Sequence, residues 1–350
     1  MTPLDTLLSS ILADPLAASR AATAPVAFVG FDFPLDLVLC GARHFSHLPW
    51  RTDRPTPAAD RWLESSFAGW TRSMLQDWAD GAFDHLDAVV FTRGDDSSQR
   101  LYYYLCELQR REFIAGPEPL MFDVAQIPRA SSIAHNRQAL TRLLDQLGID
   151  PQLLAAGRLR ANAQRELFAS LDLDRCGPGH RYEHIARASL FADLGPALQQ
   201  ATFTDDMAAP CVLLAGSSPP DDRFHCAIET VGWNVGGDSY HRALRRHGAP
   251  LATDCDALSA MASHLNQSCH GPRAFVDRTA TLLDDIKLAQ AKAVVLWLTE
   301  EDEALAWSVA QQRQALAHCG VPTLVLTRRR WDGSDGAADA MQQFLREQTQ

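Results

Sequence analysis

Closely spaced cysteines are absent from this sequence. Its 350 residues include eight cysteines, and no two of them are separated by only two residues. Zinc ribbons and ferredoxin-type clusters use such close pairs, and small secreted domains use a dense disulfide framework. We therefore expect the cysteines to be reduced thiols, several of them filling the core.

Excess positive charge and long hydrophobic runs are also absent. Lys and Arg number 32 against 43 Asp and Glu, so the formal net charge is −11 at pH 7. Such a chain repels a nucleic-acid backbone, although a helix amino terminus can still bind the phosphates of CoA or a nucleotide. No apolar run approaches the roughly 20 residues of a membrane span. Asp5 and Asp14 interrupt the first apolar stretch, where a signal peptide would be uninterrupted. We expect a cytoplasmic protein with neither nucleic-acid nor membrane partners.

Short apolar runs alternate with amphipathic stretches along most of the chain. This alternation predicts parallel sheets covered by helices. Because one core rarely extends past about 250 residues, we predict an α/β protein with two Rossmann-like or flavodoxin-like parallel-sheet lobes. The predicted strands are Val26–Val29, Ala88–Phe91, Leu120–Phe122, Cys211–Ala215, Trp233–Val235, Val294–Leu298 and Thr323–Leu326.

The amphipathic stretches divide the chain further. From Ser132 to Gln200 the periodicity is only helical, and a polar, proline-terminated connector at 202–210 precedes the next strand. We predict an N-terminal helix in 1–24, an N-terminal lobe in 25–130, a helical segment in 131–204 and a C-terminal lobe in 205–350. The other predicted helices are Leu35–Ala42, Asp60–Asp80, Ser97–Arg111, Ser132–Leu147, Pro151–Leu171, Tyr182–Gln199, Arg223–Thr230, Asp254–Leu265, Arg278–Ala291, Asp302–His318 and Ala337–Arg346.

Acidic residues follow two of the predicted strands. Asp95 and Asp96 come after one strand, and Glu300, Glu301 and Asp302 come after another. Carboxylates favour the first turn of a helix, where free N–H groups and the dipole accept negative charge, and this capping role is the commoner one. The alternative is a divalent metal site or an acid/base pair.

Two further segments allow two interpretations each. Gly216-Ser217-Ser218 follows a predicted strand and is either a phosphate-binding turn or a plain connection, since it matches neither GxGxxG nor the P-loop. His44 and His47 are three residues apart and could share a helix face as metal ligands or an acid/base pair. Two surface histidines are the more common outcome of such a spacing.

Four segments in a fixed order carry motif-like residues. They are Gly30-x3-Pro34-x-Asp36-x4-Gly41, Leu86–Val90 with Gln99–Leu105, Pro210–Ser217 with Ile228-Glu229 and Gly232–Val235, and Lys292–Val295 with Gly320–Leu324. In order and spacing, from about residue 25 onward, the chain resembles the 2-hydroxyacyl-CoA dehydratase and benzoyl-CoA reductase subunits. That resemblance implies a two-lobed α/β fold and an acyl-CoA ligand. Asp36 stands where the family has a glutamate.

The resemblance also implies three cysteines that hold a [4Fe–4S] cluster, one in each motif region. This sequence has Gly94-Asp95-Asp96 at the second position and Thr299–Asp302 at the third, and no thiol near Glu64–Gly69 at the first. Oxygen ligands do not replace thiolates on such a cluster. We therefore expect no [4Fe–4S] cluster on this chain.

Three hypotheses of different classes remain. The first is a dehydratase-like subunit without its own cluster that binds an acyl-CoA-type ligand and pairs with a cluster-bearing relative or with a second copy of itself. The second is a redox-free enzyme whose Asp95, Asp96, Glu300 and Glu301 bind a divalent metal or act as acid and base. The third is a binding module that kept the fold and lost the chemistry.

The resemblance suggests where an acyl-CoA would bind. Its pyrophosphate would lie near Gly216, Ser217 and Ser218, and its thioester near Asp36 and Ser46. Asp36 would act as a base or orient the carbonyl group. With Asp95, Asp96 and Glu300, these residues make up the candidate catalytic and binding set.

Overall fold

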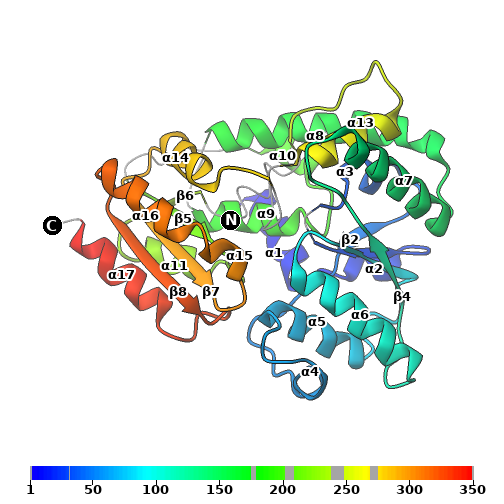
Figure 1. The fold of residues 1–350 in the computed structure, drawn as a ribbon, viewed down its shortest axis with the longest axis horizontal. Helices are drawn as coiled ribbons and strands as arrows, with labels where there is room; N and C mark the ends of the chain where they lie inside the picture. Colours follow the sequence, from blue (N-terminus) through cyan, green and yellow to red (C-terminus); the bar gives the residue numbers. More distant parts are fainter. Residues whose placement is uncertain are drawn as a thin grey trace.

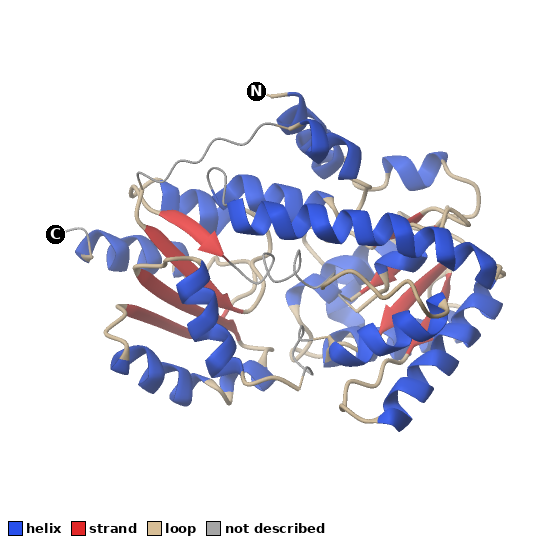
Figure 2. Ribbon diagram, turned by 90° about the horizontal axis from the view of Figure 1, so that it is seen from above, coloured by secondary structure: helices blue, strands red, loops and turns tan. Residues whose placement is uncertain are grey.

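Two separate parallel sheets form the framework of the protein. The computed structural model describes residues 2–30, 32–174, 179–201, 209–237, 248–268 and 275–348. The first sheet has the strand order β2-β1-β3-β4 and the second β6-β5-β7-β8. The predicted α/β class with two parallel-sheet lobes is confirmed, and Figure 2 shows the two lobes apart. The strands are β1 (Val26–Val29), β2 (Phe45–His47), β3 (Ala88–Thr92), β4 (Glu118–Phe122), β5 (Cys211–Gly216), β6 (Asn234–Gly237), β7 (Ala293–Thr299) and β8 (Thr323–Arg329).

The helices cover both sheets and form a third, all-helical body. They are α1 (Pro3–Ala13), α2 (Ala17–Ala21), α3 (Leu35–Val38), α4 (Pro57–Trp62), α5 (Gly69–Ala79), α6 (Asp96–Arg110), α7 (Ala130–Leu147), the 3-10 turn η1 (Pro151–Leu153), α8 (Leu154–Asp174), α9 (Gly179–Ala188), α10 (Gly195–Gln200), α11 (Arg223–Glu229), α13 (Ala257–Gln267), α14 (Arg278–Leu288), α15 (Glu303–Ala306), α16 (Val309–His318) and α17 (Ala337–Glu347). Three predicted helices are each divided into two in the structure. The resulting pairs are α4 and α5, α9 and α10, and α15 and α16. Gly195 and Pro196 start α10 and account for the second of these breaks.

The two sheets repeat one topology. In each, the first strand lies at the centre between the second and the third, and all neighbours are parallel. The third strand of each sheet starts with the same buried residues, Ala88-Val89-Val90 in β3 and Ala293-Val294-Val295 in β7. Strands buried on both faces need such uninterrupted apolar runs. The repeating unit is a whole lobe, which is longer than the periods of about 20–50 residues that mark sequence repeats.

Separate hydrophobic cores cover the two faces of the first sheet. On one face α5 and α6 pack through Trp78 and Leu101, and on the other α7 packs through Leu140 and Leu144. Helix α7, the first part of the predicted helical segment 131–204, therefore packs on the first lobe. The second lobe is built alike, with α11 and α17 on one face and α14 and α16 on the other.

Helix α13 comes from the chain of the second lobe and packs on the first. Met261 and Leu265 join the core that holds α7, and the Asn266 amide donates to the carbonyls of Ala125 and Ile127, both at 2.9 Å. Figure 1 shows α13 beside α7 and α8. This packing differs from the predicted division, which put everything after residue 205 in the C-terminal lobe. The connector predicted at 202–210 lies largely outside the described residues.

The segment leading into α13 is held by α8. Asn162 donates to the carbonyl of Leu251 at 2.8 Å and accepts from its N–H at 2.7 Å. One turn earlier, the Arg158 guanidinium donates to the carbonyls of Ala252 and Cys255. Positions four apart lie on one side of a helix, so α8 binds this segment through one face.

The third body is a helical subdomain around Phe168, Ile185 and Phe191. It joins α1 to the end of α8, α9 and α10 and has a core of its own. It also contacts both lobes, because the Leu190 carbonyl accepts from the N–H of His47 in β2 and α9 lies against α11. We call it the helical subdomain below.

The carboxyl ends of the two sheets meet at the junction between the lobes. Trp50, after β2, donates to the carbonyl of Pro220, after β5, at 2.8 Å. Trp331, after β8, lies so close to Gly69 that a Cβ there would sit 2.6 Å from its ring. Within the described residues, no helix is both long and apolar enough to cross a bilayer.

Candidate functional site

Open α/β sheets bind ligands at the carboxyl ends of their strands, where the strand order reverses. That point lies between β1 and β3 in the first lobe and between β5 and β7 in the second. Both points face the junction between the lobes. The predicted site residues are distributed over these two points, the helix α3 and the strand β2.

Asp95 and Asp96 cap a helix. The Asp95 carboxylate accepts from the backbone N–H of Ser98 at 2.7 Å, and Asp96 is the first residue of α6. The Ser98 hydroxyl donates to the carbonyl of Thr92 at 2.8 Å and fixes the turn between strand and helix. The commoner of the two predicted roles is therefore the one that the structure supports.

Replacing the cap should lower stability modestly. We expect Asp95→Ala to reduce the free energy of unfolding by about 1 kcal/mol, because the Ser98 N–H loses its acceptor. Asp95→Asn keeps an accepting oxygen and should cost much less. Urea unfolding of both variants measures the difference, and equal losses would show that the charge, and not the cap, matters.

A buried carboxylate beside this cap, that of Asp32, was not predicted from the sequence to be a site residue. Asp32 follows β1, is 7 % exposed and accepts from the Gln126 amide at 3.3 Å. A Cβ on Gly94 would lie 2.7 Å from the Asp32 carboxylate. The Thr92 hydroxyl next to it is buried and has no hydrogen-bond partner among the described residues. The position of Asp32 at a strand end was a usable signal, but the resemblance drew attention to Asp36 instead.

Asp36 lies in a buried ion pair. The Arg165 guanidinium of α8 donates to both carboxylate oxygens, one of them at 3.2 Å, and both side chains are 1 % exposed. Arg165 also donates to Asn162 at 3.0 Å. Burial and the ion pair with Arg165 favour a structural role for Asp36 over the predicted role as a base or carbonyl-orienting group.

Ser46 and the two histidines lie on or beside the short strand β2. The Ser46 hydroxyl is buried without a partner among the described residues. His47 is buried and bridges the strand ends, since its Nδ1 donates to the carbonyl of Leu48 at 2.7 Å and its Nε2 accepts from the N–H of Gly30 at 3.4 Å. His44 precedes the strand, and burial lowers its pKa. The two histidines do not share a helix face.

The turn at Gly216–Ser218 is occupied by contacts within the protein. Ser217 donates its N–H to the carbonyl of Trp297 at 2.8 Å, and its hydroxyl accepts from the N–H of Thr299 at 3.0 Å. Pro219 and Pro220 have no N–H, and Asp221 and Asp222 bring negative charge to the start of the seven-residue helix α11. This geometry does not favour a phosphate-binding turn.

The acidic residues after β7 fall into two environments. Glu300 is exposed and pairs with Arg328 at 3.0 Å. Asp302 lies against Ser217 and Thr299, and burial raises its pKa even though both hydroxyls stabilise its charge. Burial also raises the pKa of Glu301, which has one oxygen buried without a partner among the described residues.

The predicted metal ligands are not assembled into a site. In the described part of the chain, no group of three or more His, Cys, Asp or Glu side chains is placed to hold a metal ion. Asp95 and Asp96 lie at the start of α6 in the first lobe, whereas Glu300 and Glu301 follow β7 in the second.

A model of the family described as 2-hydroxyglutaryl-CoA dehydratase, D-component, matches residues 40–345. The chain belongs to this family. The match spans most of both lobes and confirms the resemblance that the ordered motifs indicated. No curated protein matches the chain.

The described cysteines do not fit the iron–sulfur cluster that the family resemblance implies. They lie at the end of α3, inside α6, at the start of β5, inside α11, before α13 and after α16, so none is at the carboxyl end of a strand; they are Cys40, Cys106, Cys211, Cys226, Cys255 and Cys319. Cys176 and Cys269 lie outside the described residues. A cluster needs several thiolates around one point, which these six do not provide.

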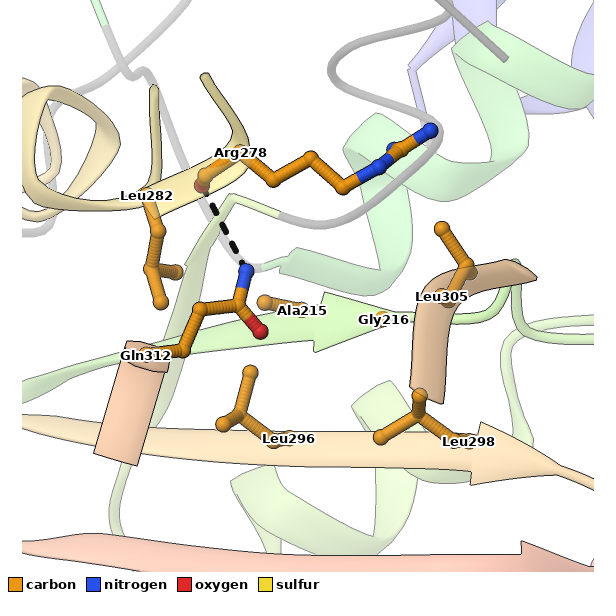
Figure 3. A pocket seen from close by; sticks show the side chains of 8 residues that line it. All are labelled: Ala215, Gly216, Arg278, Leu282, Leu296, Leu298, Leu305 and Gln312. Carbon is orange, nitrogen blue, oxygen red and sulfur yellow. Dashed lines mark hydrogen bonds between the residues drawn. The ribbon is translucent and has the colours of Figure 1, made fainter. Parts of the chain in front are cut away.

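A small pocket of about 30 Å³ opens beside Gly216 in this dehydratase-family chain. Aliphatic side chains from β7, α14 and α15 line it, and the Gln312 amide donates to the carbonyl of Arg278 at its edge (Figure 3). A volume of this size holds one or two water molecules. It is too small to enclose an acyl-CoA.

Proposed function

We propose that this chain is a cluster-free subunit of a 2-hydroxyacyl-CoA dehydratase-type assembly. It would bind an acyl-CoA-type ligand at the junction between the lobes, or support a cluster-bearing relative that does. The dispersal of the six described cysteines away from the strand ends carries this proposal. Membership of the dehydratase family supplies the reaction class.

The strand ends support a binding role more than a redox role. Asp95 caps a helix and Asp36 pairs with Arg165, and these contacts favour structural roles for both carboxylates over roles as a cluster ligand or a base. Among the described residues at the strand ends, the Thr92 hydroxyl and one carboxylate oxygen of Glu301 are buried without a hydrogen-bond partner. Such groups orient a polar ligand without transferring electrons.

Anaerobic purification from the native source tests the proposal. We expect the chain to contain no stoichiometric iron or acid-labile sulfide and to co-purify with a related subunit that contains both. Stoichiometric sulfide on the isolated chain would refute the cluster-free assignment. Co-purification with itself alone would replace the heterodimer by a homodimer.

Calorimetric titration with CoA and acetyl-CoA tests the ligand separately. Binding to the isolated chain supports a ligand-binding subunit. Binding only to the assembled complex indicates that this chain supports a relative that binds the ligand. Binding to neither would contradict the acyl-CoA part of the proposal and leave only the association with a related subunit.

A redox-free acid/base enzyme is the second candidate. The raised pKa values of Glu301 and Asp302 favour it, because a carboxyl group that retains its proton can serve as a general acid. If turnover of an acyl-CoA is found without iron, Glu301→Gln should abolish it under this candidate, whereas the first candidate predicts no turnover without the iron of a related subunit.

A further inference from the structure

Two histidines of α9 meet two carboxylates of α11. His180 Nδ1 lies 2.6 Å from the Glu229 carboxylate, which also accepts from the backbone N–H of His180 at 3.0 Å. One turn further along α9, His184 Nε2 lies 2.8 Å from the Asp222 carboxylate. The two imidazole rings are edge to face with their centroids 5.7 Å apart.

The spacing of the four residues matches the two helices. His180 and His184 are four apart and so lie on one side of α9. Asp222 and Glu229 lie at the two ends of α11, immediately before its first residue and at its last. Each imidazole therefore has its own carboxylate, and together they join the helical subdomain to the second lobe.

We propose that His180, His184, Asp222 and Glu229 form a proton-dependent clasp that docks the helical subdomain onto the second lobe. When the imidazoles are protonated, two charge-assisted hydrogen bonds hold α9 on α11. When they are neutral, each can still donate one N–H, but the charge that strengthens the bond is gone. The clasp tightens as the pH falls through the neutral range.

The negative charges around His180 favour its protonated form. Among the described elements packed against α9, helix α1 contributes Asp5, bound to Arg181 at 3.1 Å, and α11 contributes the Cys226 thiol 3.6 Å from Asp222. Strand β6 contributes only the neutral amide of Asn234, which accepts from Gly179. On α9 itself the buried Glu183 binds Arg187 at 3.1 Å and lies 3.9 Å from His184.

The direction of the pH dependence follows from the pKa shifts. The hydrogen bond that the His180 imidazole donates to Glu229 raises the pKa of His180 above its usual 6.5, although burial opposes the shift. The stabilisation is therefore complete below 6.5 and is lost as the pH rises through the raised pKa of the folded state. The hydrogen bond from His184 lowers the pKa of Asp222 from 3.8, so its contribution is present above 3.8 and fails only in stronger acid.

Two hydrogen bonds next to α9 and α11 connect the clasp to the junction between the lobes. Just beyond α9, the Leu190 carbonyl accepts from the N–H of His47 at 2.7 Å, at the end of β2 in the first lobe. Just before α11, the Pro220 carbonyl accepts from Trp50. Opening the clasp therefore loosens the support of both strand ends.

Amide hydrogen exchange of the full chain tests the clasp. We expect peptides of α9 and α11, corrected for intrinsic exchange, to be about 5- to 10-fold better protected at about pH 6 than at about pH 8. The double variant His180→Gln/His184→Gln should lose this difference, whereas peptides of β7 should be unaffected. His318→Gln, an exposed histidine on α16, is the matched control and should keep it.

Three results would overturn the proposal. They are a pH difference that survives in the double variant, an equal difference in every peptide of the chain, and a difference that disappears with EDTA, which would indicate a metal in place of protons. If the double variant is poorly folded by circular dichroism, Glu229→Gln replaces it. That variant keeps a hydrogen-bonding side chain, and removing its charge should at least halve the pH difference.

Discussion

Asp36→Asn should lower the free energy of unfolding by about 3–5 kcal/mol, the usual loss when one partner of a buried ion pair is removed. The variant retains the shape of the side chain but leaves the Arg165 guanidinium without its counter-charge. Both side chains are 1 % exposed, so water cannot replace the missing charge. Urea unfolding followed by tryptophan fluorescence measures the loss.

The double variant Asp36→Leu/Arg165→Met separates the ion pair from its surroundings. It removes both charges together, and we expect it to recover much of the loss, because apolar side chains of similar size often replace a buried ion pair without penalty. Asp284→Asn, in the exposed pair with Lys287, is the control and should leave the unfolding midpoint unchanged. If Asp36→Asn leaves stability intact yet abolishes acyl-CoA binding, Asp36 is the functional carboxylate that the sequence suggested.

Gly216→Ala should lower the free energy of unfolding by about 3–5 kcal/mol, because a strained backbone and a steric clash add together. Gly216 has φ +109°, which side chains rarely adopt, and a Cβ there would lie 2.2 Å from the carbonyl oxygen of Trp297 in β7. A backbone carbonyl in the centre of a sheet cannot move aside. The glycine is therefore required by sheet packing.

Gly232→Ala is the matched control for this effect. Gly232 has φ +80° and nothing within 4 Å of an added Cβ, so it reports the backbone strain alone, about 1 kcal/mol. Thermal or urea unfolding of both variants isolates the contact with Trp297. A Gly216→Ala chain that is as stable as wild type but fails to bind CoA would restore the predicted phosphate-binding role.

The sequence predicted the framework of the fold well. Strands such as β3 and β7 are apolar runs that bury both faces, so their signal is strong. Strand β2 was missed because three residues, Phe45–His47, are too few to show a period. The placement of α13 was not predictable either, since amphipathic periodicity shows that a helix packs on something without identifying the sheet.

The candidate site was less predictable than the fold. Asp95 could be assigned from sequence as a cap because its partner, Ser98, is three residues away. The partner of Asp36 is Arg165, and no local pattern links residues so distant in sequence. Asp32 and Thr92 come together only through the pairing of β1 with β3. Contacts between residues close in sequence, such as a helix cap, can thus be predicted from sequence. Contacts that form only when distant segments pack together cannot.

The packing of α13 also determines when the first lobe can finish folding during synthesis. Met261 and Leu265 close the core beneath the first sheet, so that core stays open until β5 and β6 of the second lobe have been synthesised. The usual order, in which an early domain is completed before the next one emerges, cannot apply here. Until then, the nascent first lobe lacks the apolar side chains with which α13 covers α7.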